Sequence, residues 1–212
     1  MRRLMCILLL MPVFAQLQAQ VAWDLKKDKN GIKVYTAKQG NSNFKSVKVE
    51  CTVNAKFPQL IAALFDIDKH HEWVYNTKSA KLLKKISDSE LVYYSEVTAP
   101  WPCSNRDFVA HLKVSERSPG ILIIESHAEP GNVEYKKNCV RILVSDSYWT
   151  ITAVSNNTLK LDYVIRFDPG GSVPAWLINL FITEGPYETF KNLQERVHLS
   201  EYQNAHYSFI RE

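Results

Sequence analysis

The sequence lacks a strong excess of charge of either sign. Its 212 residues include 26 Lys and Arg against 22 Asp and Glu, a formal net charge of +4. Domains that bind nucleic acid through their charge are much more basic. The sequence therefore has no electrostatic footprint for nucleic acid, and no nucleic-acid partner is expected.

Apolar runs long enough to span a membrane are also missing. The N-terminal run Leu4–Phe14 has about 11 residues, whereas a membrane-spanning helix needs roughly 20. Arg2 and Arg3 precede this run, and the small residues Ala15 and Ala19 follow it. This is the pattern of a secretory signal peptide, with cleavage acceptable after either alanine.

We therefore expect an exported protein, periplasmic or secreted, with a signal peptide over residues 1–19. Without Arg2 and Arg3 the chain keeps 24 basic and 22 acidic residues, a formal +2. No internal repeat and no linker rich in Pro, Gly or Ser divides the remainder. Residues 20–212 are therefore expected to form a single domain, and we expect a monomer.

Cysteines are few, and their spacing argues against a metal site. Beyond Cys6, the chain has Cys51, Cys103 and Cys139, an odd number that allows at most one internal disulfide. The spacing leaves the pairing open. The three are far apart in sequence and lack a Cys-x-x-Cys group, so no zinc or redox site is expected.

Catalytic motifs are absent as well. The sequence has no nucleophile elbow, phosphate-binding loop or zinc-protease helix. The pair His70-His71 has no acid or cysteine at a spacing that completes a metal-ligand set. We expect neither a metal nor a cofactor, and no enzyme activity.

The patterns that are present predict an α+β fold. Apolar residues at every second position over residues 47–53 indicate a half-exposed strand, and Pro58 is suited to begin a helix that ends near Phe65. A short second helical turn is expected to end at Trp73. From about residue 80 the pattern predicts strands over Ala80–Ile86, Leu91–Ala99, Asp107–Ser115, Ile121–His127, Val140–Asp146, Tyr148–Val154 and Leu159–Phe167.

One apolar helix follows the strands. Ser172 is suited to cap it, Pro174 is tolerated in its first turn, and the apolar pattern continues to about His198. Gly185-Pro186 interrupts this pattern, because Pro186 has no N–H and should kink or break the helix. A bent core helix and a hinged lid over a cavity both fit these residues.

Short motifs lie in a fixed order along the chain: Trp23, Asn30-Gly31-Ile32-Lys33-Val34-Tyr35, Asp66, Trp73, Pro102-Cys103-Ser104-Asn105-Arg106-Asp107-Phe108-Val109, Arg141 and Asp168–Pro174. In order and spacing they resemble the START (StAR-related lipid-transfer) domain over roughly Trp23 to Val197. The resemblance implies a helix-grip fold, of the kind also found in Bet v 1-like proteins. In this fold a curved antiparallel sheet wraps around a long C-terminal helix and encloses a hydrophobic cavity. It also implies binding of one lipid and its transfer between membranes.

Carried over by strand position, the resemblance implies a set of cavity-lining residues. The strands would contribute Phe108, Ala110, Leu112, Val114, Ile121, Ile123, Ile142, Val144, Leu161, Tyr163 and Ile165. The C-terminal helix would contribute Ile178, Phe181 and Ile182. The alternation by itself supports one apolar face, which a solid core would also show.

Polar groups in such a cavity would select the lipid head group. Some sterol-binding members resemble one another in having a buried acid and a buried arginine on neighbouring strands. The corresponding positions here are Tyr93 and Leu112, so that pair is absent. Tyr93, Glu125, His127 and Tyr163 remain as candidate polar anchors.

Transient membrane contact is expected at two places. One is the loop of residues 128–138, where Val133 and Tyr135 lie beside Lys136 and Lys137. The other is the helix start, at Trp176 and Leu177. A solvated loop and a core-facing tryptophan are the alternatives.

The expected function is binding of a single lipid, with transfer or sensing, in a tunnel gated by a lid. Two alternatives remain open. An enzyme of the cyclase-like or hydrolase-like helix-grip type would need acid–base groups inside the cavity, such as Glu125 or His127. A non-transporting interaction module would have a cavity filled by its own side chains.

Overall fold

The computed structural model describes residues 21–38, 45–129, 131, 133–171, 173, 177 and 180–210, except for the side chains of Lys45, Leu180 and Phe181. The expected signal peptide lies outside the described residues. So do Ser172, Pro174, Trp176, Ile178 and the side chain of Phe181.

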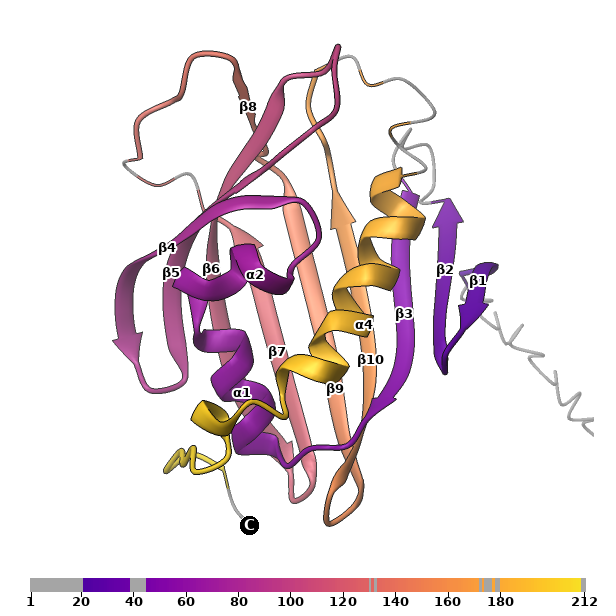
Figure 1. The fold of residues 1–212 in the computed structure, drawn as a ribbon, viewed down its shortest axis with the longest axis vertical. Coiled ribbons are helices and arrows are strands. Elements are labelled where there is room, and N and C mark those ends of the chain that lie inside the picture. Colours follow the sequence, from indigo (N-terminus) through magenta and orange to yellow (C-terminus); the bar gives the residue numbers. More distant parts are fainter. Residues whose placement is uncertain are drawn as a thin grey trace, which may run out of the picture.

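A single large sheet dominates the fold, as the strand patterns predict (Figure 1). Its path runs in the order β1-β2-β3-β10-β9-β7-β6-β5-β4, with antiparallel pairing along the whole path. The strands are β1 (Asp24–Lys29), β2 (Ile32–Lys38), β3 (Lys45–Val53), β4 (Thr77–Ser87), β5 (Glu90–Val97), β6 (Asn105–Ser118), β7 (Ile121–Ala128), β8 (Cys139–Arg141), β9 (Ser145–Ser155) and β10 (Thr158–Phe167).

The strands predicted over Val140–Asp146 and Tyr148–Val154 are wrong in their boundaries. The chain instead forms the short β8, which pairs in parallel with the start of β6, and then the single long β9. The cause is a long-range contact. Arg141 at the end of β8 forms a buried ion pair with Asp107 of β6, with Nε and Oδ1 2.7 Å apart. Alternation within one segment cannot reveal such a partner.

The helices before β4 form where the sequence predicts them. The helix α1 (Phe57–Phe65) has Pro58 in its first turn and buries Leu60, Ile61 and Leu64 on one face. A 3₁₀ turn (Ile67–Lys69) leads into the short helix α2 (His70–Trp73).

The C-terminal helix changes its hydrogen bonding at the predicted interruption. A π-helical turn (Leu180–Glu184) leads directly into α4 (Gly185–Arg196). Pro186 thus lies in the first turn of α4, and its missing N–H coincides with the change from π-helical to α-helical hydrogen bonding. In Figure 1, α4 crosses the face of the sheet over β3, β10 and β9.

Aromatic and polar contacts fix α4 on this face. Phe190 stacks on Trp149 of β9, with ring centroids 5.0 Å apart. The backbone N–H of Tyr75 donates to Thr189 Oγ1 at 3.1 Å, and Asn192 Nδ2 donates to the Trp73 carbonyl at 2.9 Å. These contacts fasten α4 to both the sheet and the α2 region.

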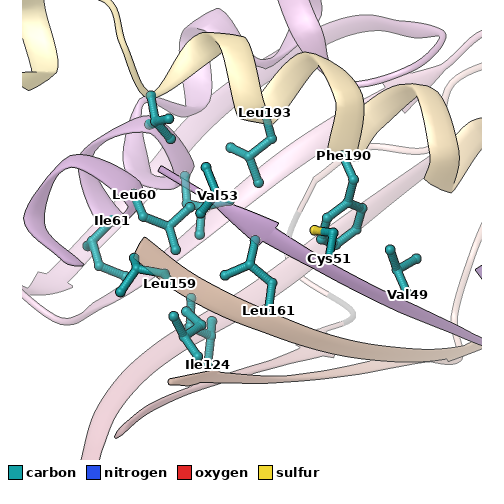
Figure 2. Close-up of a cluster of buried hydrophobic side chains, with 14 of the residues drawn as sticks. Val49, Cys51, Val53, Leu60, Ile61, Ile124, Leu159, Leu161, Phe190 and Leu193 are labelled. Atoms are coloured by element: carbon teal, nitrogen blue, oxygen red, sulfur yellow. The ribbon is translucent and has the colours of Figure 1, made fainter. Parts of the chain in front are cut away.

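The main apolar core lies where α1 and α4 meet the sheet (Figure 2). Its side chains come from elements far apart in sequence: Val49, Cys51 and Val53 of β3, Leu60 and Ile61 of α1, Ile124 of β7, Leu159 and Leu161 of β10, and Phe190 and Leu193 of α4. We call this end of the sheet face the packed half.

Candidate functional site

Beyond the packed half, the same face of the sheet borders a cavity of about 280 Å³. Strands β5, β6, β7, β9 and β10 form one wall, and α1, α2 and α4 contribute to the other. The lining residues are Leu64, His70, Trp73, Val74, Thr77, Tyr93, Ser95, Val97, Arg106, Phe108, Ala110, Leu112, Ile124, Ser126, Ala128, Ile142, Ser145, Ser147, Trp149, Tyr163, Ile165, Phe167, Pro169 and Thr189. We call this region the hollow half.

The predicted strand phase agrees with the structure on β6 and β10. Phe108, Ala110 and Leu112 line the cavity from β6, and Tyr163 and Ile165 line it from β10. Two further residues of the predicted set, Val114 and Leu161, are buried in the apolar core and do not border the cavity.

The predicted phase of β7 is wrong. Ile124, Ser126 and Ala128 line the cavity, so Ile121 and Ile123 lie on the opposite phase of the strand. The reason is visible in the sequence. The residues Ile121-Leu122-Ile123-Ile124 are all apolar, and such a run gives no alternation from which to choose a face.

This reversal also places the two candidate anchors of β7 outside the cavity. Glu125 is exposed, and His127 is exposed with its Nδ1 2.7 Å from Asp146 Oδ1. They are therefore not available to a ligand in the cavity. The other two candidate anchors, Tyr93 and Tyr163, do line the cavity.

Of the remaining predicted lining residues that the structure describes, one borders the cavity and two do not. Ile142 lines the cavity, whereas Val144 is 57% exposed and does not. Val144 follows β8, in the segment whose strand boundaries were predicted wrongly. Ile182 is buried within the apolar core rather than on the cavity wall.

Aromatic rings form one corner of the cavity. His70 makes edge-to-face contacts with Trp73 and Tyr93, with centroids 5.3 and 5.8 Å apart, and Tyr93 makes a similar contact with Phe108 at 5.8 Å. The buried indole nitrogen of Trp73 has no hydrogen-bond partner among the described residues. This corner therefore combines apolar ring faces with one N–H donor that has no acceptor among the described residues.

The charge state of this corner is set by burial. His70 Nε2 lies 2.9 Å from the Leu64 carbonyl, and since a carbonyl only accepts, Nε2 carries the hydrogen. Burial lowers the pKa of His70 to about 4 and raises the pKa of Tyr93 to about 12. Both side chains are therefore uncharged at neutral pH.

Hydroxyl groups add a polar strip to the sheet wall. Ser95 of β5, Ser126 of β7 and Ser145 and Ser147 of β9 all line the cavity. Sequence reasoning missed them, although the strand phase that places Phe108 and Ile165 inward also places their strand partners, Ser95 and Ser147, inward.

Arg106 is a further lining residue that sequence reasoning missed. The adjacent charges of Arg106 and Asp107 predict a local structural role at the start of the strand. The structure directs them to opposite faces of β6. Arg106 borders the cavity, and Asp107 pairs with Arg141 away from it.

On the side of Asp107, a group of buried polar contacts holds β8 and the preceding loop against β5 and β6. Tyr94 donates to Asp107 Oδ2 at 3.1 Å, and Glu96 accepts from Lys136 at 2.6 Å, Lys78 at 2.8 Å and Asn105 at 2.9 Å. Burial alone would raise the pKa of Glu96, but these hydrogen bonds outweigh it and lower the pKa to about 2. We call these residues, with Arg141, the outer polar cluster.

Large apolar side chains are exposed on the loops next to the hollow half. Trp101 is 90% exposed, and Tyr135, Leu143 and Val144 are exposed as well. Of the predicted membrane-contact residues, Lys137 is exposed and Val133 is partly exposed. Lys136 is bound to Glu96, and Leu177 is fully buried, so neither is free for such a contact in this conformation.

Two other kinds of site are absent from the described part of the chain. It contains no group of His, Cys, Asp or Glu side chains arranged to hold a metal ion. Within the same residues, no helix is both long and apolar enough to cross a lipid bilayer.

Comparison with known proteins decides the family. The sequence matches the START domain over residues 13–203. The chain belongs to the START domain family. The START fold expected from the sequence, a curved sheet gripping a C-terminal helix around a cavity, is confirmed.

Individual START proteins are similar along most of the chain. The phosphatidylcholine transfer protein of Mus musculus is 28% identical over 180 residues, covering 81% of this chain and 81% of that protein. A crystal structure of a STAR-related lipid transfer protein from Xanthomonas axonopodis has a TM-score of 0.76 at 30% identity, covering 84% of this chain and 99% of that one. Human STARD10 shares the fold, with a TM-score of 0.71 at 20% identity over 85% of this chain and 74% of that one. These likenesses support lipid binding and transfer in general.

Proposed function

We propose that this START domain binds a single lipid in the hollow half and carries it between membranes or senses it. The observation that carries the proposal is the cavity itself. Its wall is mainly apolar and aromatic, and none of the described lining residues is a carboxylate. Such a wall suits hydrocarbon chains better than a reaction that needs acid–base groups.

The energetics favour exchange at a membrane. Burial of about 16 methylenes at ~0.8 kcal/mol each is worth on the order of 13 kcal/mol. Escape of such a ligand into water would be very slow. We infer that the exposed Trp101 and Tyr135, together with Lys137, rest on the bilayer while the ligand crosses.

The proposal also includes a lid through which the ligand enters and leaves the cavity, and export of the protein. The segment between β10 and α4 contains two glycines with left-handed backbone, Gly170 and Gly171, and it ends at the π-helical turn. We infer that the lid is the start of the C-terminal helix, before the interruption at Gly185-Pro186, and that the two glycines and the π-helical turn allow it to move. The signal peptide over residues 1–19 would deliver the protein, as a monomer, to the periplasm or outside the cell.

The test is native mass spectrometry of the mature protein, with extraction and identification of the copurifying lipid. Ala110→Trp would fill the cavity from the centre of β6, because Ala110 is small and borders it. Lys113→Trp is the matched control, since Lys113 is exposed on the same strand. We expect one lipid per chain in the wild type and the control, and none in Ala110→Trp. A ligand-free wild type that stays ligand-free after incubation with mixed liposomes would contradict the proposal.

Membrane contact is tested separately by sedimentation with liposomes. Trp101→Ala is expected to lower liposome binding several-fold and to leave the bound lipid in place, because Trp101 does not line the cavity. Leu199→Ala is the control, since Leu199 is a large exposed apolar residue that follows α4. Equal binding by the wild type and both variants would contradict the assigned contact surface.

A further inference from the structure

Three arginines of the described chain are buried, and they differ in their partners. Arg141 pairs with Asp107, and Arg196 Nη1 lies 2.5 Å from Glu72 Oε2. Arg106, only 4% exposed, has no carboxylate within ion-pair distance among the described residues. Its positive charge is therefore not neutralised by a described side chain.

Backbone carbonyls satisfy only part of the Arg106 guanidinium. Nη1 donates to the Ser104 carbonyl at 2.6 Å, and Nε donates to the Pro169 carbonyl at 3.4 Å. A guanidinium has five N–H donors, so Nη2 keeps hydrogens for which the described residues offer no acceptor. A buried cation without a counter-charge is costly, and such a group calls for an anion from elsewhere.

The position of Arg106 in the cavity indicates the source of that anion. Arg106 is the only Lys or Arg among the described lining residues, and none of them is Asp or Glu. It lies at the end of the cavity formed by Val97, Ile142 and Pro169. The opposite end is closed by apolar side chains, including Leu64 and Ile124. The cavity thus has one cationic end and one apolar end.

We propose that Arg106 binds the anionic group, a phosphate or a carboxylate, in the head of the bound lipid. This inference rests on the proposed function and specifies its ligand class. The planar guanidinium presents parallel N–H groups that match two oxygens of either anion. The head lies at the Arg106 end, and the hydrocarbon chain extends toward Leu64 and Ile124.

The competing explanation is purely structural. Arg106 bridges the carbonyls of Ser104 and Pro169, which belong to separate loops beside the cavity. Its loss could loosen these loops and weaken every ligand alike. The test must therefore measure discrimination between ligands that differ only in head charge.

The experiment compares hexadecanoic acid, hexadecyl phosphate and hexadecanol as competitors for a fluorescent lipid bound to the mature protein. The wild type should bind at least one of the two anions about 10-fold or more tightly than the alcohol, as expected for a charge-assisted hydrogen bond. Arg106→Gln should lose this preference while its affinity for hexadecanol stays within about 2-fold. Arg106→Lys, which keeps the charge, should retain part of the preference. Arg117→Gln is the matched control, because Arg117 is exposed, donates to the Tyr148 hydroxyl and does not line the cavity.

Each result has a distinct meaning. A preference for the phosphate or for the carboxylate identifies which anion the site takes, and displacement by inorganic phosphate alone would identify a free-phosphate site instead of a lipid head. Equal affinity of the wild type for acid, phosphate and alcohol would overturn the role of Arg106 and leave the proposed function standing. Failure of the wild type to bind any of the lipids would overturn both. A parallel loss of all three ligands in Arg106→Gln, with the preference preserved, would assign Arg106 to structure alone.

Discussion

The packed half and the hollow half of the sheet face are stabilised by different interactions. In the packed half, α1 and α4 bury aliphatic side chains against β3 and β10, and Leu161 and Leu193 are almost fully buried (Figure 2). In the hollow half, the strands face a cavity and lack this packing. The outer polar cluster on the other face of β5 and β6 holds that region instead. The ion pairs thus hold the cavity wall in place from the opposite face of β5 and β6, without side chains that fill the cavity.

The largest expected effect comes from breaking the outer polar cluster. Arg141→Ala leaves Asp107 buried without a counter-ion, which should lower the free energy of unfolding by about 3–5 kcal/mol. Urea denaturation measures this effect. Arg117→Ala, at an exposed arginine, should change the free energy by less than about 0.5 kcal/mol.

A double variant distinguishes the effect of losing the ion pair from the effect of losing the packing around it. Replacing both partners, with Asp107→Leu and Arg141→Met, should recover much of the stability, because paired charges in a protein interior often exchange neutrally for apolar groups. A double variant as unstable as Arg141→Ala would show that packing of the loop, rather than the ion pair, holds the hollow half.

A smaller effect on the free energy of unfolding is expected when two positions on the same strand are compared. Leu161→Ala, in the packed half of β10, should cost about 2–5 kcal/mol of unfolding free energy. Ile165→Ala, four residues along and facing the cavity, should cost less than about 2 kcal/mol, because its side chain already borders empty space. Equal losses in urea denaturation of the ligand-free variants would contradict the distinction between the halves.

A last comparison concerns the pH dependence of stability in the hollow half. The folded pKa of His70 is about 4, below its ordinary 6.5, so the unfolded state binds more protons between these values. Stability should therefore fall as the pH drops from 6.5 to 4, by up to about 3 kcal/mol. Glu96, with a folded pKa of about 2, adds a second loss as the pH falls from 4.5 toward 2.

Two variants show which residue causes each loss of stability as the pH falls. His70→Gln should remove the loss between pH 6.5 and 4, and Glu96→Gln should remove the loss at lower pH. Thermal unfolding across the pH range measures both. An unchanged profile in His70→Gln would mean that the histidine is accessible to protons in the folded state.

The sequence allowed the prediction of the fold class, the helices α1 and α2 and the inward phase of β6 and β10, because regular alternation and helix-start residues are local signals. The phase of β7 could not be predicted, since Ile121-Leu122-Ile123-Ile124 offers no contrast between faces. The division between β8 and β9 could not be predicted either, because it depends on the contact of Arg141 with Asp107. The orientation of Arg106 was available in principle, because it has the same strand phase as Phe108.

The π-helical turn Leu180–Glu184 has a consequence for comparing relatives. A π-turn holds one residue more than the α-helical turn it replaces, and one residue of an α-helix corresponds to a rotation of roughly 100°. A relative that lacks this residue would present a different face of the segment before α4 to its ligand. A single insertion or deletion here could therefore change lipid preference in evolution without altering any residue of the sheet.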